Sequence, residues 1–118
     1  MLSPMDATPV IPHDCWAEDM DVAIAVDRYE QLTGHQVDRV GSSWAGMRSF
    51  APDNEPVIGA DPVIPAFTWL AALGGSGVKT APATGSMAAA LITDMALPQG
   101  IGPELVLRLS PARFALSA

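Results

Sequence analysis

The residues of this chain best placed to do chemistry form a glycine-rich segment between an apolar stretch and a run of small residues. The segment reads GGSGVKTAP, from Gly74 to Pro82, and it follows FTWLAAL. Glycines between a strand and a helix let the backbone come close to a ligand, and the free amides of the first helical turn then form a site for negative charge. Lys79 adds a positive charge there. The pattern predicts a cradle for an anionic oxygen or a delocalised anion, and a plain strand-to-helix turn is the alternative.

The glycine loop, Gly74–Gly77, departs from three common motifs. A G-x-G-x-x-G dinucleotide fingerprint read from Gly75 would need a third glycine where Thr80 stands. A P-loop would need a glycine where Val78 precedes the lysine. The serine of the loop lacks the G-x-S-x-G spacing of a nucleophile elbow, so hydrolysis by a serine nucleophile is excluded.

A second candidate is Arg48, which ends the stretch WAGMR. Residues 36–50 are the best strand candidate, and on such a strand Arg48 would share a face with Ser42, Trp44, Gly46 and Phe50. Placing an arginine in an apolar, aromatic setting is costly unless its planar guanidinium meets a carboxylate, which it can bind through two hydrogen bonds. The residues alone favour a structural salt bridge to one of the nearby acids, and a bound carboxylate ligand is the alternative.

The remaining ionisable residues give weaker signals. The single cysteine, Cys15, excludes a disulfide within the chain, and His13 and His35 cannot complete a zinc-site spacing with it. No metal site is therefore expected. The acids before and within the first expected helix fit a solvated face better than a catalytic pair.

Charge is distributed unevenly along the chain. The 118 residues carry a formal net charge of −7, and residues 1–59 hold ten of the 13 acids but only three of the six Lys and Arg residues. Binding of nucleic-acid phosphates needs clustered basic residues, so nucleic acid is excluded as a partner. No apolar run reaches the about 18 residues of a membrane span. The first residues lack the basic and apolar regions of a secretory signal, so the cytoplasm is the expected location.

The N-terminal half is expected to hold one helix. Three prolines within residues 1–16 favour an extended edge segment there and exclude a helix. From Glu18 onward, apolar residues recur at helical spacing opposite charged ones, and acids in the first turn complement the helix dipole. Gly34 is the kind of left-handed residue that commonly ends a helix. The spacing thus predicts an amphipathic helix between Glu18 and Gly34.

The C-terminal half is expected to place strands before a second helix. Residues 51–56 predict a turn, residues 57–61 a short strand, and residues 63–73 a longer strand buried on both faces. These elements and the two helices give an expected α+β fold, with an antiparallel or mixed sheet.

The second helix is predicted from Thr80, which would cap it, to Leu97, just before Pro98. One side of it has little side-chain bulk, which suits the close approach of another backbone. That side comprises Gly85, Ala88, Ala89, Ala90 and Ile92. The tail that follows is weakly patterned and predicts a strand or a docking segment.

Three blocks carry a resemblance: WAGMRSFAPDNEPVIGADP, then FTWLAALGGSGVKTAPATG, and the closing SPARF. Together they resemble the C-terminal part of the FAD-dependent D-amino-acid oxidase family, which includes glycine oxidases, sarcosine oxidases and DadA-like dehydrogenases. DATPVIP and DMDVAIAVDR are similar to the preceding substrate-domain segment of bacterial members. The resemblance covers nearly the whole chain and is most specific between Trp44 and Gly85.

The resemblance implies roles for both candidate regions. Arg48 matches the arginine of the W-A-G-x-R block, which binds the substrate carboxylate in glycine-oxidase-like members. The glycine loop matches a loop that lies against the isoalloxazine ring, and the following helix points its N-terminus at the N1–C2=O edge. Lys79 matches a lysine found there in sarcosine-oxidase-like members, so Arg48 and Lys79 are the implied catalytic residues. The implied cofactor-binding residues are Gly74, Gly75, Ser76, Gly77, Val78, Lys79 and Thr80.

The implied activity is that of a FAD-dependent oxidoreductase acting on the C–N bond of a small amino acid or amine. The substrate would be a D-amino acid, glycine or an N-methyl amino acid. Hydride transfer from its α-carbon to the flavin would leave an imine, which hydrolyses to an oxo acid and an amine. Family members also carry a strand, a G-x-G-x-x-G turn and a helix that receive the FAD pyrophosphate, and these 118 residues do not contain them.

The chain is therefore expected to be one C-terminal segment of a two-domain flavoenzyme without the Rossmann part. Residues 1–62 would belong mostly to the substrate-domain sheet and helix, residues 63–97 would supply the strand, glycine loop and helix of the FAD site, and residues 98–118 would form the tail. Catalysis would then need a separate chain with the Rossmann half. The expected macromolecular partner is either that chain or a second copy of this one, in a homo-oligomer. The alternative is a catalytically inactive remnant that acts as a small interaction protein.

Overall fold

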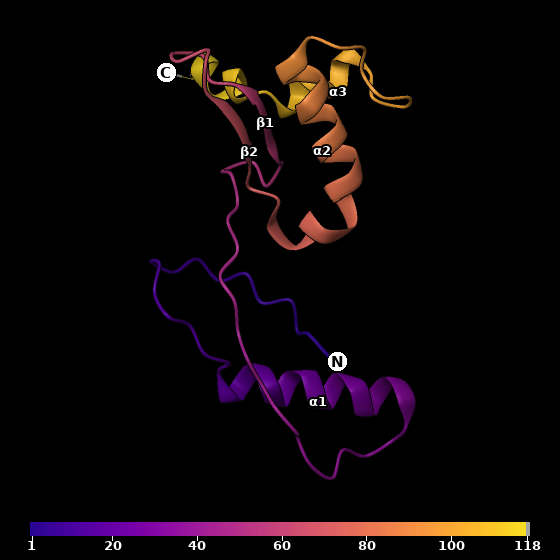
Figure 1. Cartoon of the computed structure of the whole chain (residues 1–118). Coiled ribbons are helices and arrows are strands. Elements are labelled where there is room, and N and C mark those ends of the chain that lie inside the picture. The colour runs from indigo at the N-terminus through magenta and orange to yellow at the C-terminus, as the bar shows by residue number, and fades with distance from the viewer. Residues whose placement is uncertain (118) are drawn as a thin grey trace. The chain divides into compact units, whose positions relative to one another are not determined.

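The computed structural model describes residues 1–117, which form two compact units. The N-terminal unit comprises residues 1–47 and the C-terminal unit begins at Arg48. The first contains the helix α1, and the second contains two strands, two further α-helices and two 3-10 segments (Figure 1). The expected α+β fold is confirmed. Ala118, the last residue of the predicted tail, lies outside the described residues.

In the N-terminal unit, α1 spans Asp19–Thr33, so the predicted helix is confirmed almost to the residue. Asp19 and Asp21 lie in its first turn, where negative charge is favourable. Gly34 ends the helix with a left-handed φ of 71° and donates its amide to the carbonyl of Glu30 at 2.8 Å. No residue of α1 is buried within this structure. Amphipathic spacing thus predicted the helix correctly, but the unit supplies no core for its apolar side.

The predicted strand over residues 36–50 is wrong, because none of these residues lies in a strand or helix. A strand needs a neighbour to accept and donate its backbone hydrogen bonds. In the described chain β1 pairs with β2 alone, and this segment has no strand beside it. Residues 1–16 contain no helix, as predicted, and they too join no sheet.

The sheet of the C-terminal unit is a two-stranded hairpin. Strand β1 spans Val57–Ala60 and β2 spans Thr68–Ala71, and the two are antiparallel with Ile58 opposite Leu70. The predicted turn before β1 is confirmed, with the amide of Asn54 donated to the carbonyl of Ala51 at 2.9 Å. β2 is shorter than the strand predicted over residues 63–73.

Asp61 organises the connection between the two strands. Its Oδ1 accepts the amides of Val63 and Ile64, both at 2.8 Å, and its Oδ2 accepts the indole N–H of Trp69 at 2.9 Å. These hydrogen bonds, that of Trp69 first, lower the pKa of Asp61. Because Trp69 and Leu70 remain exposed, the prediction that this strand is buried on both faces is wrong.

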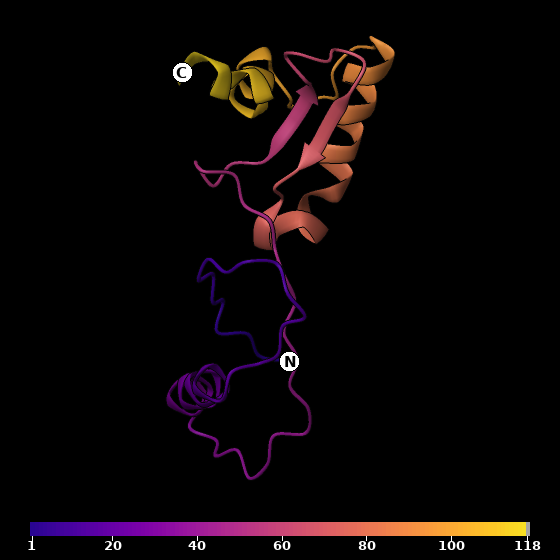
Figure 2. The same ribbon diagram turned by 90° about the vertical axis from the view of Figure 1, so that its left-hand side faces the viewer.

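Helix α2 spans Gly77–Thr93 and packs beside the hairpin (Figure 2). Ile58 from β1 and Met87 from α2 are the two largest fully buried side chains, and Ala88 and Leu109 complete the cluster. Each large side chain contributes about 2 kcal/mol by leaving water. This core holds α2 and the C-terminal segment against β1.

The limits of α2 differ from those predicted. Its first residue is Gly77 rather than one after Thr80, and the Thr80 hydroxyl donates back to the carbonyl of Ser76 at 2.9 Å instead of capping. It ends where Asp94 takes a left-handed φ of 53°, four residues before Pro98. The side predicted to have little bulk is divided, because Ala88 and Ala90 are buried whereas Ala89 and Ile92 are exposed.

The C-terminal segment is helical, so the predicted strand is wrong, whereas the alternative, a docking segment, agrees with the burial of Leu109 in the core. Helix α3 spans Pro103–Leu109, with its proline in the first turn, and a 3-10 segment follows at Pro111–Ser117. Pro111 packs on β1, since its Cδ lies 3.4 Å from where a Cβ of Gly59 would be. Among the described residues, no helix combines the length and apolar character needed to cross a bilayer.

Candidate functional site

The glycine loop joins β2 to α2 through one 3-10 turn, Gly74–Ser76, and α2 begins at the next residue. Ala72 and Gly74 have left-handed φ angles of 56° and 52°, with the right-handed Leu73 between them. Such alternation bends the backbone sharply and turns successive amides toward one side. For Ala72, which is not glycine, this conformation costs about 1 kcal/mol. The core on either side of the loop therefore holds it in a conformation that Ala72 alone would avoid.

Two amides of the loop already have partners within the chain. The amide of Gly74 donates to the carbonyl of Ser49 at 3.2 Å, and the amide of Ser76 donates to that of Leu73 at 3.1 Å. The donors left for a ligand are thus those of the first turn of α2. Amides from Gly77 to Lys79 have no acceptor inside α2, because the carbonyls four residues earlier precede the helix.

The start of α2 is positive and uncompensated by the described chain. Ser76, at the N-cap position, makes no side-chain capping hydrogen bond, and the first turn contains no acid. Lys79 is exposed, and within residues 1–117 its ammonium makes no ion pair or hydrogen bond. Val78 beside it is 95% exposed. Amide dipoles and a full positive charge therefore add at one open helix end.

Arg48 lies beside this loop through Phe50. Its Cζ lies 5.7 Å from the centroid of the Phe50 ring, so the predicted aromatic neighbour is present although the predicted strand is not. The Phe50 ring in turn rests against the backbone of Gly74. Within the C-terminal unit, the structure thus places Arg48 and the glycine loop on either side of one residue, Phe50, which contacts both.

Two hollows of the C-terminal unit lie away from the glycine loop. One of about 420 Å³ is lined by the hairpin and the later part of α2, including Ile58, Thr68 and Leu91. Another of about 320 Å³ lies between α2 and α3, against Met95 and Leu107. Neither includes a residue of the glycine loop. These two hollows are therefore separate from the backbone donors at the loop.

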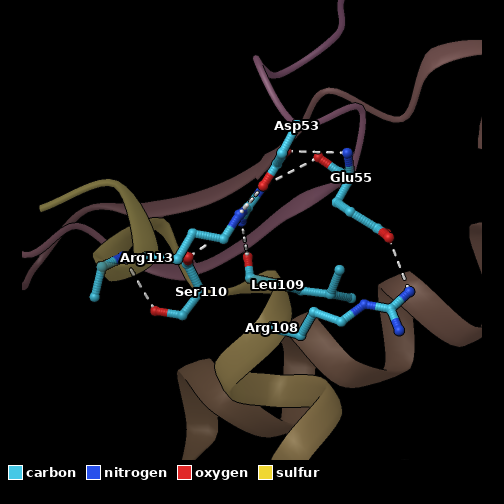
Figure 3. A network of polar contacts seen from close by, with 7 residues as sticks. Asp53, Glu55, Arg108, Leu109, Ser110 and Arg113 are labelled. Atoms are coloured by element: carbon cyan, nitrogen blue, oxygen red, sulfur yellow. Dashed lines mark hydrogen bonds and ion pairs between the residues drawn. The ribbon is translucent and has the colours of Figure 1, made fainter. Parts of the chain in front are cut away.

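Arg113 forms a second charged region, which sequence reasoning did not predict (Figure 3). Its Nε and Nη2 donate to the two carboxylate oxygens of Asp53 at 2.7 and 3.1 Å. Nη2 also donates to the carbonyl of Glu55 at 3.1 Å, and Nη1 donates to the carbonyls of Leu109 and Ser110 at 2.8 and 3.1 Å. We call Arg113 and these four partners the arginine clamp, since they tie the C-terminal segment to the turn before β1.

The arginine clamp changes the titration of its carboxylate. The hydrogen bond from the Arg113 guanidinium is the largest cause that lowers the pKa of Asp53, to about 2. Arg108 makes a separate ion pair with the Glu55 side chain at 2.9 Å. The signal for this region was an acidic turn at residues 51–56 and a closing arginine in SPARF, but no spacing rule pairs residues 60 positions apart.

The other ionisable residues that the structure describes do not form a metal site. Within residues 1–117, no group of three or more His, Cys, Asp or Glu side chains is gathered so that it could hold a metal ion. His13 lies edge-on to Trp16, with ring centroids 5.8 Å apart, and Cys15 is a half-buried free thiol.

Comparison with known proteins gives one family match. Residues 16–91 match the sequence model of the family described as FAD dependent oxidoreductase. The matched segment includes Arg48, the glycine loop and most of α2, and it ends before α3.

Proposed function

Because this chain belongs to the FAD-dependent oxidoreductase family, we propose that it supplies the flavin edge and the substrate-carboxylate site of an amino-acid or amine oxidoreductase. The family uses FAD and a small-molecule substrate. The proposed reaction is oxidation of the C–N bond of a D-amino acid, glycine or an N-methyl amino acid.

One observation carries the proposal: the open, positive start of α2. Its donor set consists of the first-turn amides and the Lys79 ammonium, with no capping side chain and no acid beside them. A flavin accepts negative charge at its N1–C2=O edge on reduction, and hydrogen-bond donors with a nearby cation stabilise that charge. The chemistry of these donors therefore fits the cofactor of the family.

In this mechanism the side chains of the chain bind and orient. Arg48 would hold the substrate carboxylate through its planar guanidinium, in the geometry that favours two parallel hydrogen bonds. The backbone of Gly74–Thr80 and the ammonium of Lys79 would hold the pyrimidine edge of the flavin. When bound, FAD supplies the hydride acceptor. Fixing both ends of the reacting pair lowers the entropic part of the barrier.

The proposal divides the chain by role. Residues 1–62 are assigned mostly to the substrate domain, residues 63–97 to the FAD site, and residues 98–118 to a tail. The G-x-G-x-x-G turn for the FAD pyrophosphate is not among these residues, so the proposal assigns that contact to a Rossmann segment outside them. We assign that segment to a separate chain, because a homo-oligomer of these residues would not contain the turn either.

A second candidate function is that of a small interaction protein without catalysis. It is favoured by apolar side chains exposed on the hairpin connection, where Val63 is 84% and Ile64 61% exposed. Exposed apolar residues that lie together are typical of surfaces that bind a partner.

Titration of the purified chain with FAD, followed by flavin absorbance and equilibrium dialysis, tests the proposal. We expect Lys79→Met to weaken binding by a factor of at least about ten, since a charge-assisted hydrogen bond contributes about 1.5–3 kcal/mol. Arg108→Met is the matched control, because its 64% exposed side chain removes the same charge away from the loop. Equal FAD affinity in the wild-type chain and Lys79→Met, or no binding at millimolar FAD, would contradict the proposal and favour the second candidate.

A further inference from the structure

Phe50 occupies the space that a side chain at position 74 would need. A Cβ on Gly74 would lie 2.6 Å from Cε1 and 3.1 Å from Cδ1 of the Phe50 ring, and real Cβ atoms do not approach so closely. The left-handed φ of Gly74, 52°, is a separate demand for glycine. Glycine at this position therefore allows both the bend of the loop and the contact of the ring with its backbone.

Arg48 lies near the same ring of Phe50. Its guanidinium carbon is 5.7 Å from the ring centroid of Phe50, within the range of a cation–π interaction. Ser49, between the two residues in sequence, accepts the Gly74 amide at 3.2 Å. Residues 48–50 are thus joined to the glycine loop by a backbone hydrogen bond and, independently, by the ring of Phe50.

We propose that Phe50 is a positioning residue that fixes the Arg48 guanidinium relative to the glycine loop. This inference rests on the proposed function, in which Arg48 binds the substrate carboxylate and the loop binds the flavin. An arginine side chain has large rotamer freedom, and contact with a ring reduces the conformational entropy that the side chain loses on binding. Through Phe50, the carboxylate of a substrate is held at a set distance from the flavin edge.

The first test uses the full chain without cofactor. Proton NMR of wild-type, Phe50→Leu and Phe50→Tyr chains would measure ring-current shifts of the Arg48 side-chain protons and of the Gly74 α-protons. We expect both sets of shifts in the wild type, their loss in Phe50→Leu and their return in Phe50→Tyr. Unchanged shifts in Phe50→Leu would overturn the inference.

The second test approaches the contact from the loop. Gly74→Ala should push the ring aside and move the Nε–H signal of Arg48. Gly100→Ala is the matched control, because Gly100 also has a left-handed φ, 85°, but nothing lies within 4 Å of its Cβ position. The inference requires that only Gly74→Ala moves the Arg48 signal. A signal that both variants move equally, or that neither moves, would overturn it.

The third test separates this inference from the proposed function. Acetate, as a simple carboxylate, is titrated while the Nε–H signal of Arg48 is followed. We expect Phe50→Leu to weaken acetate binding about 2- to 5-fold, the range of an exposed cation–π contact, and Phe50→Tyr to restore it. If wild-type Arg48 does not respond to acetate, its proposed carboxylate role fails, whereas the first two tests still decide whether Phe50 positions it. A response of equal strength in wild type and Phe50→Leu contradicts the positioning role alone.

Discussion

The arginine clamp and the start of α2 are both positively charged, but they differ in whether their hydrogen-bond donors have acceptors within the chain. At the clamp, Nε, Nη1 and Nη2 of Arg113 all donate to acceptors of the same chain, and the side chain is 14% exposed. At the start of α2, the first-turn amides have no acceptor within the helix and Lys79 has no partner among residues 1–117. Matched donors hold a fold together, whereas unmatched donors mark a place where a ligand can bind.

The largest change in stability is expected from Arg113→Met, which removes the arginine clamp. Methionine keeps much of the apolar length of the side chain but removes every donor, so three backbone carbonyls and the Asp53 carboxylate lose the hydrogen bonds that they accept from the guanidinium. We expect the free energy of unfolding to fall by about 2 kcal/mol. Urea denaturation followed by circular dichroism would measure it.

Arg108→Met is the control for the clamp, because Arg108 makes one ion pair and its side chain is 64% exposed. Exposed pairs contribute about 0–1 kcal/mol, so a small change is expected. If both variants lose the same stability, the clamp is no more important than a surface ion pair.

Acid should weaken the clamp before it affects the start of α2. The pKa of Asp53 is about 2 in the folded chain, below its ordinary value of 3.8, so its charge stabilises the fold fully above about pH 4. That contribution is lost as the pH falls toward 2, and the lowered pKa of Asp61 acts in the same direction. Urea midpoints at pH 5 and pH 2.5 should therefore differ. They should differ less in Arg113→Met, in which Asp53 has lost the largest cause of its lowered pKa.

Gly85→Ala tests how much the helix propensity of α2 contributes to stability, apart from the arginine clamp. Gly85 lies in the interior of the helix, and nothing lies within 4 Å of the position of a Cβ. Alanine should raise the free energy of unfolding by about 0.5–1 kcal/mol, because glycine is the weaker helix former. Thermal denaturation would show a higher midpoint. A lower midpoint would mean that the added methyl meets a contact absent from the described structure.

The smallest expected change is that of the free energy of unfolding in Lys79→Met, and the sign of this change tests the role of Lys79. A cation in the first turn is unfavourable toward the positive helix end, so its removal should raise stability by about 0.3 kcal/mol. The same variant is expected to bind FAD more weakly. Arg113 should stabilise the fold, whereas Lys79 should slightly destabilise it and strengthen FAD binding. Loss of stability in Lys79→Met would instead give Lys79 a structural role.

Local sequence signals were sufficient to predict elements whose hydrogen bonds lie within one short segment of the chain. The helix between Glu18 and Gly34 could be predicted because its spacing and its left-handed end both lie within it. The turn at residues 51–56 and the strand from Val57 were found for the same reason. The strand over residues 36–50 was wrong because alternation shows only that a segment could pair, and its partner must come from elsewhere in the chain.

The candidate site was predicted in its parts and not in its connections. Glycines before a small-residue helix indicated the loop, and an arginine near an aromatic indicated Arg48. The contact that joins them, Phe50 against Gly74, depends on a loop conformation that no spacing rule encodes. Arg113 escaped prediction because its acceptors include three carbonyls, and every residue has a carbonyl, so the sequence carries no mark of them.

The hydrogen bond between Trp69 and Asp61 has a practical consequence. Trp69 is the one tryptophan of the C-terminal unit, since Trp16 and Trp44 both lie in the N-terminal unit. Its indole N–H donates to the carboxylate of Asp61, and protonation of that carboxylate weakens the bond. The ring of Phe67 lies 5.0 Å away, centroid to centroid. In a chain with Trp16 and Trp44 replaced by phenylalanine, the emission of Trp69 would be an optical reporter of the hairpin, sensitive to the charge of a single side chain.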